Sequence, residues 1–457
     1  MDRPLVMKFG GTSVGNAAAI SQVARIVADA RGSAGGLVVV VSAMSGVTDL
    51  LLAAGAAAPA GDLADVDRRV TELLHRHQAI VDELSVADDQ LLPQVRRDCD
   101  DVRAVLRSVA VLHELTPRGA DRVAAAGELM SSRMLAQLLR SRAVPACWVD
   151  ARRTLLTDAN FGAATPLDAS SDSIAREILP ILERGEVAVV GGFVGATADG
   201  ITTTLGRGGS DYSAAIIGAA LDAREIQIWT DVDGMLTADP RIIPEAQPVR
   251  QLSFEEAAEL AYFGAKVLHP GTILPAVEKN IPVRILHTMQ PKSAGSVITT
   301  SAANSNRPLT AIACKRNVTV VDVTSARMLL AHGFLKRLFE VFERHATSVD
   351  VVTTSEVSVS MTLDDDRTIE AIERDLAGFA SVRIERGMAI VTAVGDTLRT
   401  DPTMAVSVIA ALGRLPLRMV SQAASRRNVT VVLNDADVPA AMARLHAEFF
   451  ARQGATA

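Results

Sequence analysis

The chain has 457 residues, of which 49% are hydrophobic, 22% are charged and 3% are aromatic. This length exceeds one ordinary hydrophobic core and predicts roughly two to four domains. The formal net charge of -7 at pH 7 disfavours a nucleic acid or an anionic membrane as a partner.

The cysteines and the apolar segments indicate the compartment. Cys99, Cys147 and Cys314 are widely spaced and match no metal-ligand pattern, which favours a reducing, cytoplasmic setting. No basic region followed by an apolar stretch of signal length is found at the start. Gly55 and Pro59 interrupt the alanine-rich segment at 50–60, so it cannot span a bilayer. We therefore expect a cytoplasmic protein with no membrane partner.

Short apolar runs alternate with helical patterns along the first part of the chain. The runs at 5–9, 37–42 and 187–191 predict strands that are buried on both faces, as in a parallel sheet. The patterns at 17–31 and 121–139 predict helices that cover such a sheet. A long charged stretch at 62–112 predicts a helical hairpin with solvated charged faces.

A lysine and a glycine-rich loop end the first predicted strand, where residues 8–15 read KFGGTSVG. Glycine backbone and hydroxyl groups between a strand and a helix can face an anion, so a phosphate-binding loop is one interpretation. A tight strand-to-helix turn that needs glycine is the other. The chain contains neither a P-loop nor a Gly-x-Gly-x-x-Gly pattern.

Two further stretches carry charged residues in unusual surroundings. Glu128 lies among apolar and small residues, where an amine partner and a surface position in a first helical turn are both open. Residues 202–211 read TTTLGRGGSD, in which the planar guanidinium of Arg207 is suited to grip a carboxylate. Asp211 could orient a lysine or a substrate ammonium, or could cap the helix expected from Tyr212.

Residues 229–241, WTDVDGMLTADPR, carry an apolar strand into a polar loop, where open α/β sheets bind ligands. Residues 263–270, FGAKVLHP, add a second lysine, Lys266. Lys8 and Lys266 together suit the spread negative charge of a transferring phosphoryl group. Taken singly, Lys266 has another interpretation, as a solvated lysine on a helix. His269 has one too, as a residue that ends a helix before Pro270.

The composition changes at 299–308, TTSAANSNRP, which predicts a linker. Beyond it, KRNVTVV at 315–321 recurs as RRNVTVV at 426–432, which indicates two copies of one small unit of strands and helices. A coincidental echo between strands is the alternative. An amphipathic helix is predicted over 334–345, with Leu335, Leu338, Phe339 and Phe342 on one face.

Four of these stretches, in this order, resemble the aspartokinase family of the amino-acid-kinase fold: KFGGTS, TTLGRGGSD, WTD and FGAKVLHP. The likeness covers nearly the whole chain. It implies an α/β fold class, with an amino-acid-kinase-like, mostly parallel sheet covered by helices, followed by a pair of α+β ACT domains of βαββαβ type. The implied boundaries are a catalytic domain at 1–298, the linker at 299–308 and tandem ACT domains at 309–457, the first at about 317–386 and the second at about 309–316 plus 387–457.

The resemblance implies an enzyme, aspartate kinase, that transfers the γ-phosphate of ATP to the side-chain carboxylate of L-aspartate. The product would be 4-phospho-L-aspartate, in the first step toward lysine, threonine, methionine and diaminopimelate. Mg²⁺ would be held through the ATP phosphates, without a protein metal site. Lys8 would neutralise the transferring phosphoryl group, Lys266 would lie by the ATP, and Asp211 would hold the lysines in place.

The remaining implied site residues fall into two sets. Aspartate would be bound by Ser42, Thr48, Glu128, Phe193, Arg207 and Ser210. ATP would be bound by Lys8, Gly10, Gly11, Thr12, Ser13, Thr230, Asp231, Leu236, Asp239, Arg241 and Lys266. Leu236 departs from the tyrosine that aspartokinases often have there, although a leucine can still cover an adenine by apolar contact.

The C-terminal part is closest to lysine-sensitive, monofunctional aspartokinases and so implies feedback inhibition, with lysine as the expected effector. The effector would be bound by Met328, Gly333, Leu335, Ser348, Val349, Asp350, Thr354, Ser355 and Glu356. Asp350 would meet its side-chain ammonium. A second departure is Ala331 with His332, where such relatives tend to carry His-Ser, so another amino acid stays open as effector. ACT domains pair strand edges across subunits, so a homodimer or a larger homo-oligomer is expected.

Two rival functions stay open. Another member of the amino-acid-kinase fold, acting on glutamate, acetylglutamate or a nucleotide, would share the fold but lack the context of Arg207 and Asp211. A catalytically inactive amino-acid sensor would use only its ACT pair, and the presence of Lys8, Arg207, Asp211 and Lys266 argues against it. The lack of a dinucleotide fingerprint disfavours a fused dehydrogenase.

Overall fold

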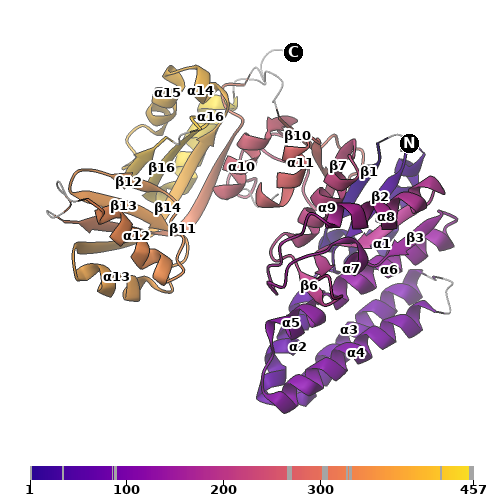
Figure 1. Cartoon of the computed structure of the whole chain (residues 1–457). Helices are drawn as coiled ribbons and strands as arrows, with labels where there is room; N and C mark the ends of the chain where they lie inside the picture. Colours follow the sequence, from indigo (N-terminus) through magenta and orange to yellow (C-terminus); the bar gives the residue numbers. More distant parts are fainter. Residues whose placement is uncertain are drawn as a thin grey trace. The chain divides into compact units, whose positions relative to one another are not determined.

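The computed structural model describes residues 3–32, 35–84, 86, 90–264, 270–300, 307–325, 328, 332–422 and 425–451. It divides into two compact units (Figure 1). The first holds the described residues of 1–235, 250–254 and 267–302, and the second those of 236–249, 255–266 and 303–457. In the part of the chain that the structure describes, no helix is long and apolar enough to cross a membrane.

The first unit is built on an eight-stranded sheet with the order β3-β4-β2-β1-β7-β9-β10-β8. All neighbouring strands are parallel except β9 and β10, so the mostly parallel sheet is confirmed. The strands are β1 (Leu5–Phe9), β2 (Leu37–Val41), β3 (Ala146–Val149), β4 (Val187–Gly191), β7 (Glu225–Thr230), β8 (Gln251–Ser253), β9 (Val283–His287) and β10 (Ser296–Thr299). Every residue of β1, β2 and β4 is buried, as their continuous apolar runs predict.

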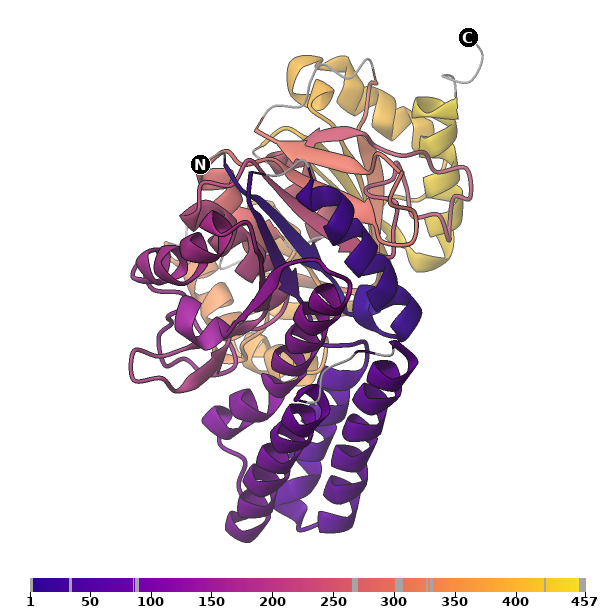
Figure 2. The same cartoon turned by 90° about the vertical axis from the view of Figure 1, so that its right-hand side faces the viewer.

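Helices cover this sheet, and the predicted hairpin at 62–112 is confirmed as two long helices. They are α3 (Leu63–Leu84) and α4 (Leu91–Leu112), which lie side by side in both views (Figures 1 and 2). The predicted helix at 17–31 is α1 (Ala17–Arg31). The single helix predicted at 121–139 is instead two, α5 (Pro117–Ala124) and α6 (Ala126–Ser141), which meet at Ala125, a residue that keeps right-handed helical backbone angles.

The other elements of the first unit are short or lie at its edges. They are α2 (Val47–Ala57), α7 (Ala151–Thr154), α8 (Ser170–Glu183), α9 (Gly209–Ala220), α11 (Leu274–Glu278), the 3₁₀ turns η1 (Gly11–Val14), η2 (Ala58–Ala60) and η3 (Pro270–Ile273), and the two-stranded sheet of β5 (Val194–Ala196) and β6 (Thr202–Thr204).

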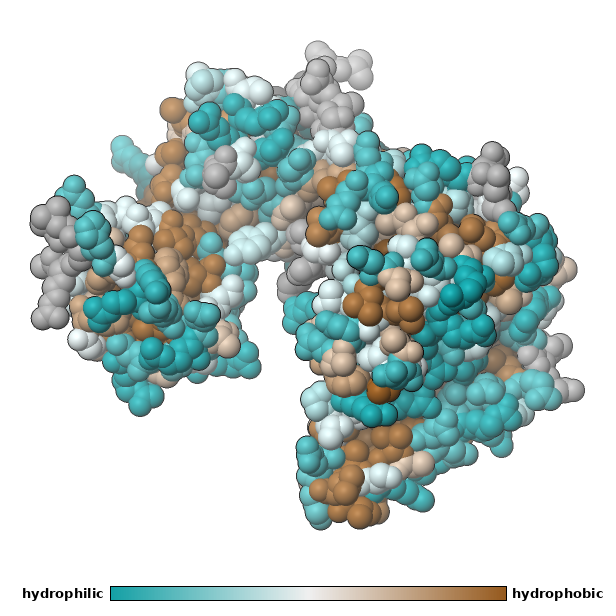
Figure 3. All heavy atoms as spheres, viewed as in Figure 1, coloured by the Kyte–Doolittle hydropathy of each residue, from teal (hydrophilic) through white to brown (hydrophobic). Residues whose placement is uncertain are grey.

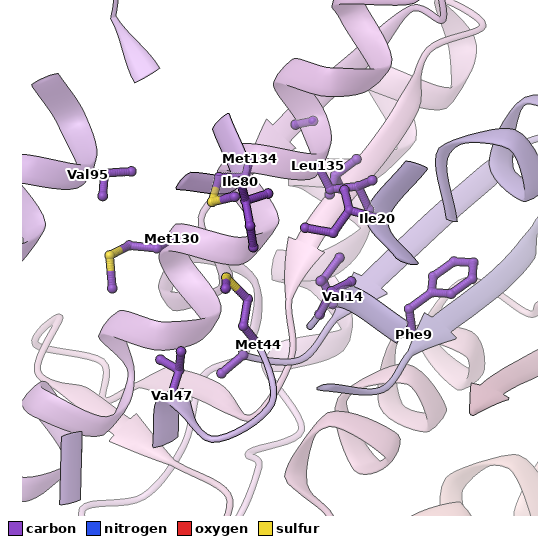
Figure 4. Close-up of a cluster of buried hydrophobic side chains, with 14 of the residues drawn as sticks. Phe9, Val14, Ile20, Met44, Val47, Ile80, Val95, Met130, Met134 and Leu135 are labelled. Atoms are coloured by element: carbon purple, nitrogen blue, oxygen red, sulfur yellow. The ribbon is translucent and has the colours of Figure 1, made fainter. Parts of the chain in front are cut away.

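One hydrophobic core joins the sheet to the helical layer. It takes apolar residues from β1, α1, α2, α3, α4 and α6 (Figure 4), among them Phe9, Ile20, Val47, Ile80 and Met130. Burial of this kind supplies most of the stability of a domain, at roughly 25 cal/mol per Å² of apolar surface. Figure 3 shows mostly hydrophilic residues along the hairpin of α3 and α4, as its charged sequence predicts, and hydrophobic residues at its lower end. Leu63, Val111 and Leu112, at the outer ends of these helices, are exposed.

The second unit contains a six-stranded antiparallel sheet with the order β12-β13-β11-β14-β16-β15. Its strands are β11 (Ala311–Thr324), β12 (Val352–Thr354), β13 (Ser358–Leu363), β14 (Ser381–Val394), β15 (Met419–Ser421) and β16 (Asn428–Asn434). Its helices are α10 (Phe254–Tyr262, of which residues 255–262 belong here), α12 (Phe334–Arg344), α13 (Ile369–Ala377), α14 (Thr397–Thr400), α15 (Thr403–Leu412) and α16 (Val438–Phe449), with the turn η5 (Asp435–Asp437).

The two long strands β11 and β14 run through both halves of this sheet. The first part of β11, Ala311 to Lys315, pairs with Ile390 to Val394, and the part after a register shift pairs with residues 381–388. Two separate cores lie on the halves, one around α12 and α13 and one around α15 and α16. The predicted pair of ACT-like units is thus one continuous sheet with two cores.

The echo between 315–321 and 426–432 does not mark equivalent strands. Residues 318–321 lie on central β11, whereas 429–432 lie on β16, which forms an edge hairpin with β15 and is followed by α16. The strand in the same position of the first half is β13, which pairs with edge strand β12 and is followed by α13. The shared letters are therefore a coincidence of strand composition, although two copies of the unit exist.

The buried face of α12 also differs from the prediction. Leu338 and Phe342 are buried as expected, but Leu335 is 41% and Phe339 is 37% exposed. Phe334 and Val341 take their places in the core. The helix begins at Phe334 after Gly333, so its apolar stripe follows positions 334, 338, 341 and 342.

Candidate functional site

A cavity of about 370 Å³ lies in the first unit where β1 and β2 end. The carboxyl ends of parallel strands are where open α/β sheets bind ligands. The lining residues include seven predicted side chains and part of the glycine loop: Lys8, Gly11, Ser42, Thr48, Glu128, Phe193, Ser210 and Asp211, together with Ala43, Met44, Ser45, Gly46, Asp49, Gly206, Gly208 and Gly209. The structure therefore brings together four stretches that are far apart in the sequence.

Lys8 and Asp211 form an ion pair in this cavity. The Lys8 Nζ lies 2.6 Å from the Asp211 Oδ1, and the two side chains are only 11% and 16% exposed. Asp211 lies in the first turn of α9, which begins at Gly209 after Gly208, so the alternative role of Asp211 as a helix cap does not apply. A buried ammonium held by one carboxylate keeps its charge and its direction, which suits a group that meets phosphate oxygens.

Glu128 is buried in the same cavity, and the pKa of its carboxyl is raised. Its side chain lies in the first turn of α6 but is buried, so the alternative prediction of a carboxylate at the surface is wrong. Burial raises the pKa of Glu128 to about 8, although a hydrogen bond from the Ala43 backbone opposes the shift. Within the described residues its Oε2 atom has no hydrogen-bond partner. A ligand ammonium would supply the missing partner and restore the charged form.

Two helix N-termini reach the cavity without a side-chain cap. They belong to α2, after Gly46, and to α9, after Gly208. Uncapped N–H groups and the helix dipole favour a negatively charged ligand at these ends. The loop at 8–15 does not offer an uncapped N-terminus of α1 to an anion. The Asn16 side chain accepts a hydrogen bond from the Ala19 backbone N–H and caps that helix.

The turn between β4 and β5 packs closely against the start of α9. Phe193 has a positive φ of 64°, uncommon for a bulky residue, and its backbone N–H donates to the Ser213 Oγ at 2.9 Å. A Cβ on Gly209 would lie 2.6 Å from the Phe193 ring, so glycine is needed there. This strained, glycine-dependent contact fixes the start of α9 against the cavity.

The other residues of the two glycine motifs lie around the cavity or beneath it. Arg207 is exposed and sits between Gly206 and Gly208, both of which line the cavity. Thr12 is exposed, whereas Ser13 is buried with its hydroxyl 2.6 Å from that of Thr288. Gly10 lies next to the Lys8 ammonium, since a Cβ there would be 3.7 Å from Nζ. Ser13 thus ties the loop to the sheet, while Gly10 and Gly11 lie near the lysine.

The predicted nucleotide residues are divided between the units. Thr230 ends β7 in the first unit and Asp231 follows it; the Thr230 hydroxyl donates to the Asp231 carboxylate at 3.1 Å. Leu236, Asp239 and Arg241 belong to the second unit, and there Arg241 Nη2 lies 2.6 Å from Asp239 Oδ2. Lys266 and His269 lie outside the described residues.

The predicted effector residues belong to the first half of the second unit. Gly333 precedes α12, Met328 and Val349 pack against the core, and five residues are exposed: Leu335, Ser348, Thr354, Ser355 and Glu356. The Asp350 side chain is only 4% exposed and pairs with Lys315, a partner that the sequence did not indicate. Ala331 lies outside the described residues.

One positioning residue was missed in the sequence. Asp121 is 3% exposed and accepts from the Thr204 backbone and hydroxyl and from the Gly162 backbone. It thereby fixes the strand that leads into the glycine loop at 205–209. Its place at the start of an apolar helical pattern gives no sign of partners so far away in the sequence.

Comparisons with known proteins match this architecture. Residues 3–287 match the model of the amino acid kinase family, and residues 391–449 match an ACT domain. The chain is 38% identical to aspartokinase 3, chloroplastic, of Arabidopsis thaliana, over 97% of this chain and 81% of that protein. It is 36% identical to the lysine-sensitive aspartokinase 3 of Escherichia coli K12, over 98% of this chain and all of that protein.

Two solved structures of E. coli aspartokinase III also resemble the chain, each at 34% identity. The complex with aspartate and ADP, described as the R-state, has a TM-score of 0.83 over 98% of this chain and 100% of that one. The complex with lysine and aspartate, described as the T-state, has a TM-score of 0.84 over 98% of this chain and 99% of that one.

Proposed function

Because the chain belongs to the amino acid kinase family and, within it, to the aspartokinases, we propose that it phosphorylates the side-chain carboxylate of L-aspartate with ATP. One observation carries the proposal. Within the described residues, a single cavity at the ends of β1 and β2 holds the cation of Lys8 and the buried carboxyl of Glu128, whose Oε2 atom has no hydrogen-bond partner. The cavity thus offers a positive group to a phosphoryl group and an acid to an amino acid's ammonium.

In this reaction a carboxylate oxygen of aspartate attacks the γ-phosphorus of ATP, and the bond to the β-phosphate oxygen breaks. Such a transfer needs positioning and neutralisation of charge more than covalent help from the protein. Lys8, held by Asp211, meets the negative charge that moves from the γ-phosphate to ADP. The uncapped N-termini of α2 and α9 add to this field.

Aspartate is placed by the opposite charges of its own groups. Its ammonium binds Glu128, and Arg207 at the rim grips a carboxylate, with Ser42, Thr48, Phe193 and Ser210 around it. The nucleotide lies along Gly10, Gly11, Thr12, Thr230 and Asp231 of the first unit. Contacts from Leu236, Asp239, Arg241 and Lys266 stay predictions from the resemblance.

Mg²⁺ is proposed to arrive on the ATP phosphates, as is usual for this ion in kinases. Two cavity carboxylates fit that arrangement, because Asp211 is already paired with Lys8 and burial favours the protonated form of Glu128. When bound, the ion neutralises phosphate charge. A reducing cytoplasm remains the proposed location, since Cys99, Cys147 and Cys314 are all unpaired.

Feedback inhibition by lysine through the second unit is part of the proposal. It is supported by the ACT match, by the lysine complex of the E. coli relative and by the acidic Asp350. Inhibition requires that lysine bind an inactive arrangement more tightly than an active one. A homodimer or larger assembly is also proposed, because β12 and β15 are edges of the six-stranded sheet. A monomeric mass by light scattering at working concentration would contradict it.

The deciding experiment traps the acyl phosphate with hydroxylamine and measures the hydroxamate formed from ATP and L-aspartate. Glutamate, acetylglutamate and a nucleoside monophosphate are run in parallel, and only aspartate should give turnover. Repeating the assay with lysine, threonine and methionine identifies the effector. Turnover with another acceptor, or none with aspartate, would reject the proposal in favour of another kinase or of an inactive sensor.

A further inference from the structure

Asp350 is held by two side chains from different parts of the second unit. The Tyr262 hydroxyl donates to its Oδ1 at 3.0 Å, and the Lys315 ammonium donates to its Oδ2 at 3.0 Å. Burial and the neighbouring charge of Asp350 raise the pKa of Tyr262, so the phenol keeps its proton and acts as the donor. The carboxylate expected to bind an effector ammonium already binds an ammonium of the chain itself.

Lys315 has a second acidic partner. Its Nζ lies 2.8 Å from Asp364 Oδ2, and the Asp364 side chain is 47% exposed, compared with 4% for Asp350. Two carboxylates and one ammonium leave this cluster with one net negative charge. A second ammonium can therefore enter, because Lys315 can stay with Asp364 and no buried charge is left unpaired.

Tyr262 connects the cluster to α10. Three residues on one side of this helix contact the sheet region: Glu256 accepts from Thr310 and from the Asp396 backbone, Glu259 accepts from Ser425 and Asn428, and Tyr262 donates to Asp350. Glu256 and Glu259 reach the second half of the sheet, and Tyr262 reaches the first. The helix thus joins both halves.

The chain just after Tyr262 is packed equally closely. A Cβ on Gly264, whose φ is +119°, would lie 2.2 Å from the Cys314 carbonyl oxygen, so only glycine fits there. The Lys315 ammonium also lies over the Tyr262 ring, 5.3 Å from its centre. Residues 262–264 therefore rest directly on residues 314–315, so a change at Lys315 is felt at the end of α10.

We propose that Lys315 is an internal ligand of Asp350, that the side-chain ammonium of a free amino acid competes with it, and that Tyr262 transmits the exchange to α10. The proposal rests on the proposed aspartokinase function and refines its regulation. The incoming ammonium takes Oδ2 of Asp350, Lys315 remains on Asp364, and the shifted carboxylate no longer holds Tyr262 as before. Lys315 then sets effector affinity, and Tyr262 is a positioning residue for the coupling.

The test separates binding from inhibition, with L-lysine as the probe and L-norleucine, which lacks the side-chain ammonium, as its control. Calorimetry gives the Kd, and the hydroxamate assay gives the inhibition. Lys315→Met should bind L-lysine about tenfold more tightly than the unaltered chain, within the usual range of coupling energies. Lys336→Met removes a 79% exposed lysine of the same half and should change nothing. L-norleucine should not gain affinity in any variant.

Tyr262→Phe provides the second arm, in case Lys315→Met unfolds. It should bind L-lysine within about threefold of the unaltered chain while its maximal inhibition falls by about half or more. Equal or weaker L-lysine binding in Lys315→Met, or full inhibition in Tyr262→Phe, overturns the inference. Calorimetry needs no turnover, so a chain that binds as expected without phosphorylating aspartate would refute the proposed function and not the internal ligand.

Discussion

The Lys8 ammonium, at the end of β1, lies 2.6 Å from the carboxylate of Asp211, in the first turn of α9. Both side chains are largely buried, so each charge depends on the other for compensation. Removal of one partner of such a pair leaves an unpaired buried charge, which typically costs about 3–5 kcal/mol of stability. A substitution at Lys8 is therefore expected to change both the stability of the protein and its catalytic rate, and both must be measured.

Lys8→Ala should lower kcat by about 10²- to 10³-fold, because the lysine charge is used chiefly on the transferring phosphoryl group. The KM for aspartate should change far less. Hydroxamate formation at saturating ATP gives both constants, and thermal melting identifies lost stability. Asp211→Asn is the companion variant, which keeps the shape of the pair but removes the negative charge. Near-normal turnover with collapsed aspartate binding would reverse the role given to Lys8.

Arg207→Ala should act mainly on aspartate binding. A hydrogen bond to a charged group contributes about 1.5–3 kcal/mol, so we expect the KM for aspartate to rise about 10- to 100-fold with a smaller loss of kcat. Arg207 is exposed, so the melting temperature should not move. Arg25→Ala, at another exposed arginine of the first unit, is the control. An unchanged KM would remove Arg207 from the aspartate site.

Glu128 should make aspartate binding depend on pH. Burial raises its pKa to about 8, so in the free enzyme the carboxyl is mostly neutral below this pH and charged above it. An ammonium binds the charged form, so the KM for aspartate should fall as the pH rises from 7 to 9. Glu128→Gln should bind aspartate weakly and lose this dependence, as followed by ADP release across the range. The same slope in both proteins would contradict the role.

His77 should make the helical hairpin sensitive to acid. Burial lowers its pKa from 6.5 to about 4, so the unfolded chain binds the proton more readily between these values. The free energy of unfolding should therefore fall as the pH drops from 6.5 to 4, by up to about 3 kcal/mol. His77→Leu should flatten this part of the profile in urea titrations, and His75→Leu, at an exposed histidine of the same helix, should not. If the free energy of unfolding changed with pH in the same way in His77→Leu and in the unaltered chain, His77 would not be the source of the acid sensitivity.

Much of the fold follows from local sequence. The buried runs at β1, β2 and β4 and the periodicity of α1, α3 and α4 appear as expected, because the apolar pattern of each element is carried by its own residues. Lys8, Glu128 and Asp211 were singled out because glycine-rich or apolar surroundings make a charge conspicuous, although the sequence alone left a structural alternative open for each. The structure places all three around one cavity. A local conflict with ordinary helix and strand composition thus marks a candidate site, and the fold brings its parts together.

The partners of these residues could not be predicted in the same way. The contacts of Asp121 with Thr204, and of Asp350 with Lys315 and Tyr262, join positions far apart in the chain, and no local pattern encodes them. The repeat at 315–321 and 426–432 led to a different error. The two segments have similar residues, but they occupy different positions in the sheet. On α12, the position of the first helical residue decided which of the phenylalanines are buried.

The two 14-residue strands β11 and β14 also have a consequence for inheritance. Each strand serves both halves of the six-stranded sheet, so a gene that lost or duplicated one half would encode a strand without its continuation. Recombination that preserves the sheet therefore cannot fall within β11 or β14, and it must also keep residues 236–249 and 255–266, which belong to the same unit. The pair, rather than the single half, is the smallest part of this sheet that can be inherited intact.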